Sequence, residues 1–124
     1  IPSRMCVQLM YALYKIKGDP EYLEIIKNNI VMKKEKTSYA ALIVQDLDKD
    51  DKKIYDFLCN LYVSDIDSLE ASIVEDGIMY LKGFRKKLFS FELTDEERAM
   101  HRKYYSEDVE ERKRLMAEFR KEFG

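Results

Sequence analysis

Three aspartates alternate along the chain like the first ligands of an EF-hand calcium loop: Asp46, Asp48 and Asp50. In such a loop, glycine at the sixth position makes a sharp turn, and a bidentate glutamate at the twelfth completes the coordination. This sequence has Asp51 and Phe57 at those two places. We therefore expect no calcium site here, and we interpret the acidic run as a solvated turn before a helix.

A single histidine, His101, limits imidazole chemistry. Histidine-rich zinc sites and the paired Glu-x-x-His motifs of di-iron helical bundles both need more than one. Glu97 stands four residues earlier, a spacing that places two side chains on the same face of a helix. We interpret His101 as a partly exposed helix residue beside Glu97.

The two cysteines, Cys6 and Cys59, form no C-x-x-C pair and lie within apolar helical patterns. Cysteine in that setting behaves as a small hydrophobic residue, so we predict buried, reduced thiols and a cytoplasmic protein. The sequence also contains no G-x-S-x-G, G-x-G-x-x-G or G-x-x-x-x-G-K motif. We accordingly expect no catalytic residue, no metal site and no cofactor.

The composition favours a folded, helical protein. Hydrophobic residues make up 46% of the 124 residues and charged residues 37%, which is enough apolar surface to form a core. Only four glycines and two prolines interrupt the chain, so few breaks are expected. We predict an all-α fold: a single domain over residues 1–124, built as a compact bundle of five to seven helices.

Acidic and basic residues nearly balance, with 24 Asp and Glu against 22 Lys and Arg and a formal net charge of −2. This balance argues against a dedicated nucleic-acid coat and against a polybasic membrane anchor. No apolar run reaches the roughly 20 residues that span a bilayer. We therefore expect no membrane association, and nucleic acid as a partner only through a local basic patch.

Two helices have informative apolar patterns. The first runs from Ser3 to Gly18, and its simplest core stripe, with helical spacing, consists of Met5, Leu9, Ala12, Leu13 and Ile16. It is apolar nearly all round, which predicts either the central helix of the domain or an oligomer contact; we favour the central position. The second is one long central helix, about 67–92, whose apolar side chains recur every three or four residues. Its stripe contains Leu69, Ile73, Gly77, Tyr80, Phe84, Leu88 and Phe91. Gly77 on this stripe predicts either a close approach of a neighbouring helix or a kink.

Shorter segments complete the expected bundle. Residues 39–46 are compatible with a helix or a buried strand, and we favour a helix because no second β-like run exists to pair with. Thr94 and Glu97 match the T-x-x-E capping box at a helix start, and Asp108 is placed to cap the last helix.

Surplus tyrosines suggest a contact surface, because tyrosine is enriched in interfaces. The residues that fall off the simplest core stripes, and form our candidate interface, are Tyr11, Tyr14, Tyr104 and Tyr105. The leading hypothesis is a non-catalytic helical interaction module that acts through protein–protein contacts, with a protein partner or a second copy in a homodimer.

The alternative hypothesis is a nucleic-acid-associated helical protein, a replication or regulatory accessory. Its candidate basic patch is Lys82, Arg85, Lys86, Arg112 and Arg114. The outline from Ile66 to Phe123, a long predicted helix followed by a capped turn and helices that fold back, resembles the helical hairpin at the C-terminal, helicase-binding end of bacterial primases. The resemblance lies in helix length and charge and assigns no residue a role.

Overall fold

The computed structural model describes residues 3–31, 39–64 and 70–124. Over these ranges the chain folds into seven helices without a strand, which confirms the predicted all-α class. The helices are α1 (Ser3–Lys17), α2 (Glu21–Val31), α3 (Tyr39–Val44), α4 (Lys52–Ser64), α5 (Glu70–Leu81), α6 (Asp95–Tyr104) and α7 (Val109–Phe123). The ambiguous segment 39–46 is therefore helical at α3. None of the described helices has both the length and the apolar character needed to cross a bilayer.

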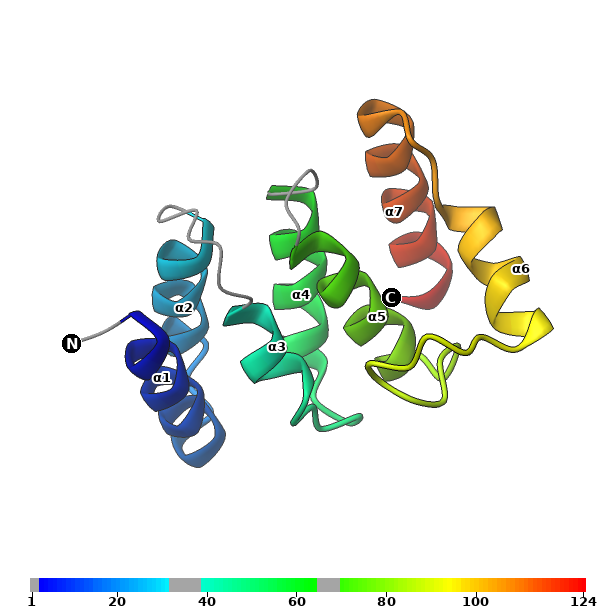
Figure 1. Ribbon diagram of the computed structural model, residues 1–124. Helices are drawn as coiled ribbons and strands as arrows, with labels where there is room; N and C mark the ends of the chain where they lie inside the picture. Colours follow the sequence, from blue (N-terminus) through cyan, green and yellow to red (C-terminus); the bar gives the residue numbers. More distant parts are fainter. Residues whose placement is uncertain (1–2, 32–38, 65–69) are drawn as a thin grey trace.

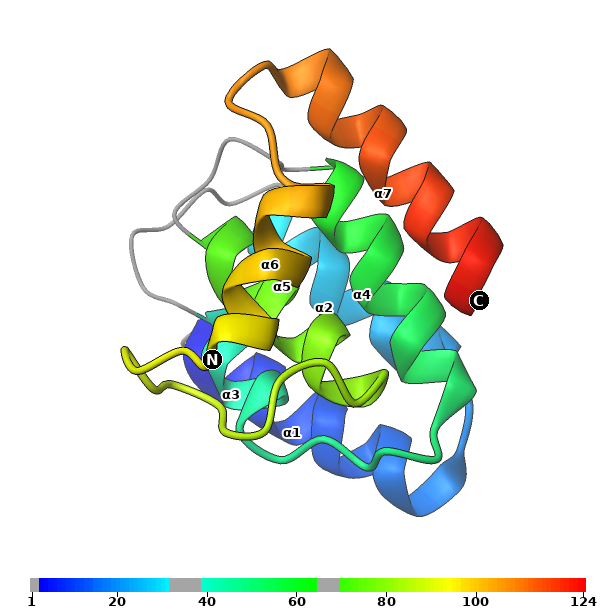
Figure 2. The same cartoon turned by 90° about the vertical axis from the view of Figure 1, so that its right-hand side faces the viewer.

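The helices form two pairs at opposite ends of the molecule, with α3, α4 and α5 between them (Figure 1). α1 packs on α2 at one end, and α6 packs on α7 at the other. Figure 2 views the molecule from the α6–α7 end. The core is built around α4, because this helix contacts α2, α5 and α7. The fully buried side chains include Ile26, Ile54, Leu58, Ile78 and Phe119.

The prediction of one long helix over 67–92 is wrong in its extent. α5 ends at Leu81, and residues 82–94 form turns and irregular chain. The predicted start, residues 67–69, lies outside the described residues. Because the long helix was the main element of the likeness to the primase hairpin, that likeness loses its basis.

Gly83 is the physical reason why α5 stops. Its φ of +81° lies in the left-handed region, which glycine enters without a steric penalty. The Gly83 N–H donates to the Tyr80 carbonyl at 3.1 Å, and the Phe84 N–H donates to the Met79 carbonyl at 2.8 Å. These are the two hydrogen bonds of a Schellman C-cap, which turns the chain away from the helix axis. The apolar spacing that continues beyond Gly83 is therefore not helical.

α1 lies at the edge of the molecule, so the prediction of a central first helix is wrong (Figure 1). It packs against α2 and α3, and it buries Val7, Tyr11 and Tyr14. Four of the five side chains expected to form its buried stripe face solvent instead, and the fifth, Leu13, is half-buried. We call this exposed stripe the outward face of α1; it consists of Met5, Leu9, Ala12 and Ile16.

α5 approaches α3 closely at Gly77. A Cβ atom at this position would lie 3.0 Å from Val44 Cγ2 and 3.3 Å from both Val44 Cγ1 and Leu47 Cδ1. Of the two interpretations that the sequence left open, close approach is the one observed. The absence of a side chain at Gly77 lets the two helices pack together.

Candidate functional site

The tyrosines predicted to form an exposed interface lie mostly in the core. Tyr11, Tyr14 and Tyr104 are 6%, 3% and 5% exposed, and Tyr105 is half-buried. A tyrosine ring can be buried where its hydroxyl finds a partner. The hydroxyls of Tyr11 and Tyr14 donate to a backbone carbonyl, at 2.9 Å, and to a carboxylate of the 46–51 segment. These side chains stabilise the fold, and the exposed apolar surface of α1 is on its other face.

Two of the five residues of the candidate basic patch, Arg85 and Arg114, have their charge compensated by carboxylates. Arg85 is 8% exposed and lies among carboxylates, while Arg114 forms ion pairs with two glutamates of α7. Lys82 lies over the ring of Tyr55, with its ammonium 4.0 Å from the ring centroid. Binding to a phosphate backbone depends on clustered cations, and two of these five charges are compensated.

The acidic run before α4 is a turn and helix start, as predicted. Asp48 accepts a hydrogen bond from the Asp50 N–H at 3.1 Å, and Asp51 accepts one from the Ile54 N–H at the start of α4, also at 3.1 Å. Across the ranges that the structure describes, no group of three or more His, Cys, Asp or Glu side chains is arranged to hold a metal ion.

Both cysteines are free thiols. Cys59 is buried in α4, and Cys6 is half-buried in α1. Burial raises the pKa of Cys59 to about 11, so the thiol stays protonated near neutral pH. Because the thiolate is the reactive form, Cys59 behaves as a core residue.

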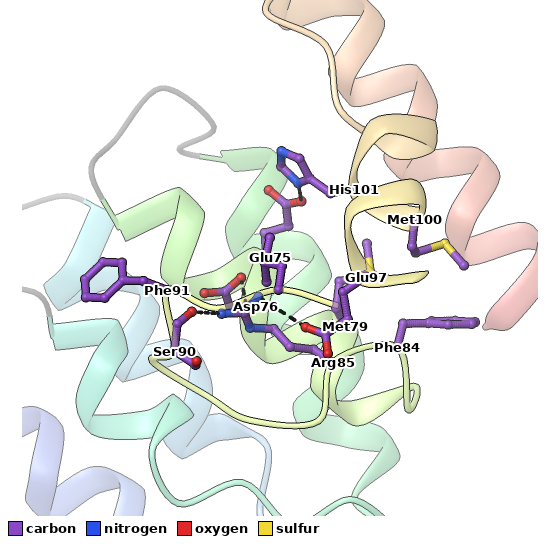
Figure 3. Close-up of a pocket in the computed structure, with 11 residues that line it drawn as sticks. Glu75, Asp76, Met79, Phe84, Arg85, Ser90, Phe91, Glu97, Met100 and His101 are labelled. Atoms are coloured by element: carbon purple, nitrogen blue, oxygen red, sulfur yellow. Dashed lines mark hydrogen bonds and ion pairs between the residues drawn. The ribbon is translucent and has the colours of Figure 1, made fainter. Parts of the chain in front are cut away.

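A cavity lined by both charged and apolar side chains lies between α5, α6 and the 82–94 segment (Figure 3). It has a volume of about 250 Å³. Its charged lining consists of Glu75, Asp76, Arg85, Glu97 and His101, and we call it the acidic pocket. Two consecutive helices and the irregular segment between them thus line one cavity.

Local structure positions each of these groups. α5 carries Glu75 and Asp76, and the Schellman turn at its end directs the chain so that Arg85 follows in the next segment. Thr94 caps α6 by accepting a hydrogen bond from the Glu97 N–H at 3.2 Å, which confirms this part of the predicted capping box. Glu97 and His101 then project from successive turns of α6.

Arg85 is the buried cation of the acidic pocket. Its guanidinium donates to the Ser90 carbonyl and lies between two carboxylates (Figure 3). Arg85 Nε is 3.6 Å from an Asp76 oxygen, and an Nη atom is 3.8 Å from a Glu97 oxygen. Both distances exceed hydrogen-bond length, and Arg85 Nε is buried without a hydrogen-bond partner. Arg85 is therefore held by one hydrogen bond and two ion pairs, and its Nε is enclosed by protein.

His101 links α6 to α5. Its Nδ1 lies 2.9 Å from a Glu75 oxygen, and its ring stacks on Tyr105 with 4.8 Å between centroids. The hydrogen bond to Glu75 raises the pKa of His101 above its ordinary value, against an opposing effect of burial. The imidazole is partly exposed, as predicted, but its partner is Glu75 and not the expected Glu97.

Asp76 is a partly buried carboxylate, with 37% of its side chain exposed. Burial raises the pKa of this carboxyl, and the neighbouring carboxylates Glu75 and Glu97 add to the effect, although Arg85 opposes it. Desolvated carboxylates of this kind interact strongly with a cation. The cation that these carboxylates hold in the structure is Arg85.

Sequence reasoning missed Glu75 and Asp76. One signal was present: these adjacent acids interrupt an otherwise apolar helix. Their convergence with Glu97 and Arg85 depends on the path of residues 82–94, which the predicted long helix concealed.

Comparison of the chain with protein-family models, with curated proteins and with solved structures gives no match.

Proposed function

We propose that the protein is a non-catalytic interaction module whose contact surface is the outward face of α1. The observation that carries this proposal is the exposure of large apolar side chains in one helical stripe. Met5, Leu9 and Ile16 are 58%, 50% and 79% exposed. A contiguous apolar stripe rimmed by polar residues is typical of a protein-binding surface.

A second copy of this chain is the occupant that the charges favour. In a two-fold symmetric contact the same patch on each subunit meets its partner, so any charge near the axis meets a like charge. Residues 5–14 contain no charged side chain. Lys15, the next residue, already has an ion pair with Asp46 at 2.9 Å. Two copies can therefore meet at residues 5–14 without like charges near the axis, and the exposed Lys17 lies at the end of the helix.

A contact made by the outward face alone would be small. The face consists of four side chains, whereas a stable interface has about 20–30 residues on each side. A stable dimer buries about 800 Å² on each partner. We expect association that depends on protein concentration.

Sedimentation velocity over a range of concentrations tests the proposal. The weight-average mass of the wild type should rise with concentration, and Leu9→Glu or Ile16→Glu should keep the protein monomeric. Val63→Glu is the matched control, because it places the same charge at a partly exposed apolar site on α4. A wild-type protein that stays monomeric at the highest concentration, or unchanged association in both α1 variants, would overturn the proposal.

A further inference from the structure

The outward face of α1 is symmetric about its own middle. Met5 and Ile16 are equally far from the midpoint between residues 10 and 11, and so are Leu9 and Ala12. A two-fold contact brings the same patch of two subunits together. When the two-fold axis passes this midpoint at right angles to α1, the helices run antiparallel. Met5 of each copy then meets Ile16 of the other, and Leu9 meets Ala12.

The sizes of these side chains fit the antiparallel pairing better than a parallel one. In the antiparallel pair, the large Leu9 of each copy lies opposite the small Ala12 of the other, so no layer joins two small side chains. In a parallel pair, Ala12 would meet Ala12 between the larger layers of Leu9 and Ile16. Such a gap loses contacts that a close-packed interface makes.

The charges along α1 favour the same direction. Lys15 and Lys17 both lie in its last turn. A parallel pair would gather four lysines at one end and align the two helix dipoles, whereas an antiparallel pair separates the lysines and opposes the dipoles. At about 100° per residue, position 4 of the second copy falls on the opposite flank from Lys17. It falls on the same flank as Lys15, whose charge Asp46 already balances at 2.9 Å.

A groove beside the outward face of α1 enlarges the contact. It lies between α1 and α3, has a volume of about 600 Å³, and we call it the α1–α3 groove. Ala12 and Ile16 belong both to its lining and to the outward face, and Leu42 adds an apolar side chain from α3. The two-fold axis of an antiparallel pair keeps the same flank of each helix on the same side. The grooves of both copies therefore adjoin, and the contact extends beyond the four side chains of α1.

We propose that two copies of this chain associate through antiparallel α1 helices, with Leu9 of each copy over Ala12 of the other at the edge of the α1–α3 groove. This inference rests on the proposed self-association through the outward face of α1. It adds the direction and register of the helices and the part of α3 that joins the contact.

Disulfide trapping tests the direction. Met5→Cys and Ile16→Cys are made in a Cys6→Ser background; Cys59 stays, because it is fully buried and its thiol remains protonated. The two variants are mixed in equal amounts and oxidised gently, and intact mass spectrometry separates the three possible linked dimers. We expect the mixed dimer to far exceed half of the linked protein, the share for random pairing, because disulfides form only between neighbouring Cα atoms. Val63→Cys on α4 is the control and should link with neither variant.

Ala12→Leu tests the direction by affinity. The site is exposed, and leucine is a good helix former, so the monomer keeps its fold. In the antiparallel pair the added side chain collides with Leu9 of the second copy at two equivalent places. Self-association in sedimentation velocity should then weaken about tenfold. In a parallel pair the same change would fill the gap between two Ala12 side chains and strengthen association.

The failure of this inference differs from the failure of the proposed function. A wild-type protein that stays monomeric, with no linked dimer of any kind, overturns both. A protein that associates but links identical variants preferentially, or links all variants at random, overturns the antiparallel pairing alone. Association that Ala12→Leu strengthens or leaves unchanged does the same.

Discussion

Replacing Gly77 by alanine measures how tightly α3 and α5 pack. In a helix interior, alanine is favoured over glycine by about 1 kcal/mol. The added methyl would lie 3.0 Å from Val44 Cγ2, and Val44 is fully buried with a branched side chain that has little rotamer freedom. Overpacking of this kind costs about 1–3 kcal/mol. We therefore expect Gly77→Ala to lower the free energy of unfolding by about 1 kcal/mol.

The same change should have the opposite sign when Val44 is shortened. Val44→Ala removes the two methyl groups nearest to the new Cβ, and the remaining neighbour, Leu47 Cδ1, is the end of a flexible side chain. In the Val44→Ala background, Gly77→Ala should then raise the free energy of unfolding by up to about 1 kcal/mol, because only helix propensity remains. The coupling energy between the two sites should be about 2 kcal/mol.

Urea unfolding of the four proteins, followed by far-UV circular dichroism, provides these free energies. The comparison is valid if the dependence on urea concentration is the same for all four, which shows that the unfolded states are equally exposed. A Gly77→Ala protein more stable than the wild type, or an equal effect in both backgrounds, would refute the reasoning about close packing.

Three further changes test other features of the fold. Gly83→Ala should lower the free energy of unfolding by about 1–2 kcal/mol, since the left-handed conformation is unfavourable for alanine; no atom lies within 4 Å of the new Cβ, so the effect is one of the backbone alone. Tyr14→Phe should lower it by about 1 kcal/mol, because the hydroxyl no longer donates to Asp51. The hydrogen bond to Glu75 raises the pKa of His101 above 6.5. The stability that this hydrogen bond gives to the fold is complete below pH 6.5, and it is lost as the pH rises through the pKa of His101 in the folded protein. Relative to His101→Gln, the wild type should thus lose stability as the pH rises above 6.5.

Denaturant unfolding again measures each effect. Unchanged stability of Gly83→Ala would contradict the Schellman explanation for the end of α5. A Tyr14→Phe protein as stable as the wild type would mean that the hydroxyl of Tyr14 contributes nothing to the free energy of unfolding. Parallel pH profiles for the wild type and His101→Gln would show that the link to Glu75 does not favour the protonated imidazole.

The apolar pattern predicted α1 as a helix but selected the wrong face for burial. Ranking by hydrophobicity places leucine, isoleucine and methionine inside and tyrosine outside. In the structure Tyr11 and Tyr14 are buried, because their hydroxyls meet acceptors in the 46–51 segment. A pattern read along one helix cannot include partners more than 30 residues away. The helix class was therefore predictable from local sequence, and its orientation was not.

The acidic pocket was hidden for a related reason. Each of its helices was expected, and the start of α6 at Thr94 was placed correctly. Its geometry depends on one glycine, Gly83, whose left-handed conformation ends α5 in the middle of a continuous apolar repeat. Periodicity measures spacing and is unaffected by backbone conformation, so the repeat predicted a helix where the chain turns.

α6 buries little apolar surface against the rest of the molecule, and this determines which part of the fold detaches first. The structure describes all of α6, and Tyr104 is its buried residue. His101 of α6 contacts α5 through its polar interaction with Glu75. A segment with so little buried apolar surface detaches at a lower free energy than the core. In native-state hydrogen exchange, the amides of α6 should exchange through local opening, whereas those of α4 should exchange only through global unfolding. The acidic pocket would then be exposed and reassembled repeatedly in a molecule whose core stays folded.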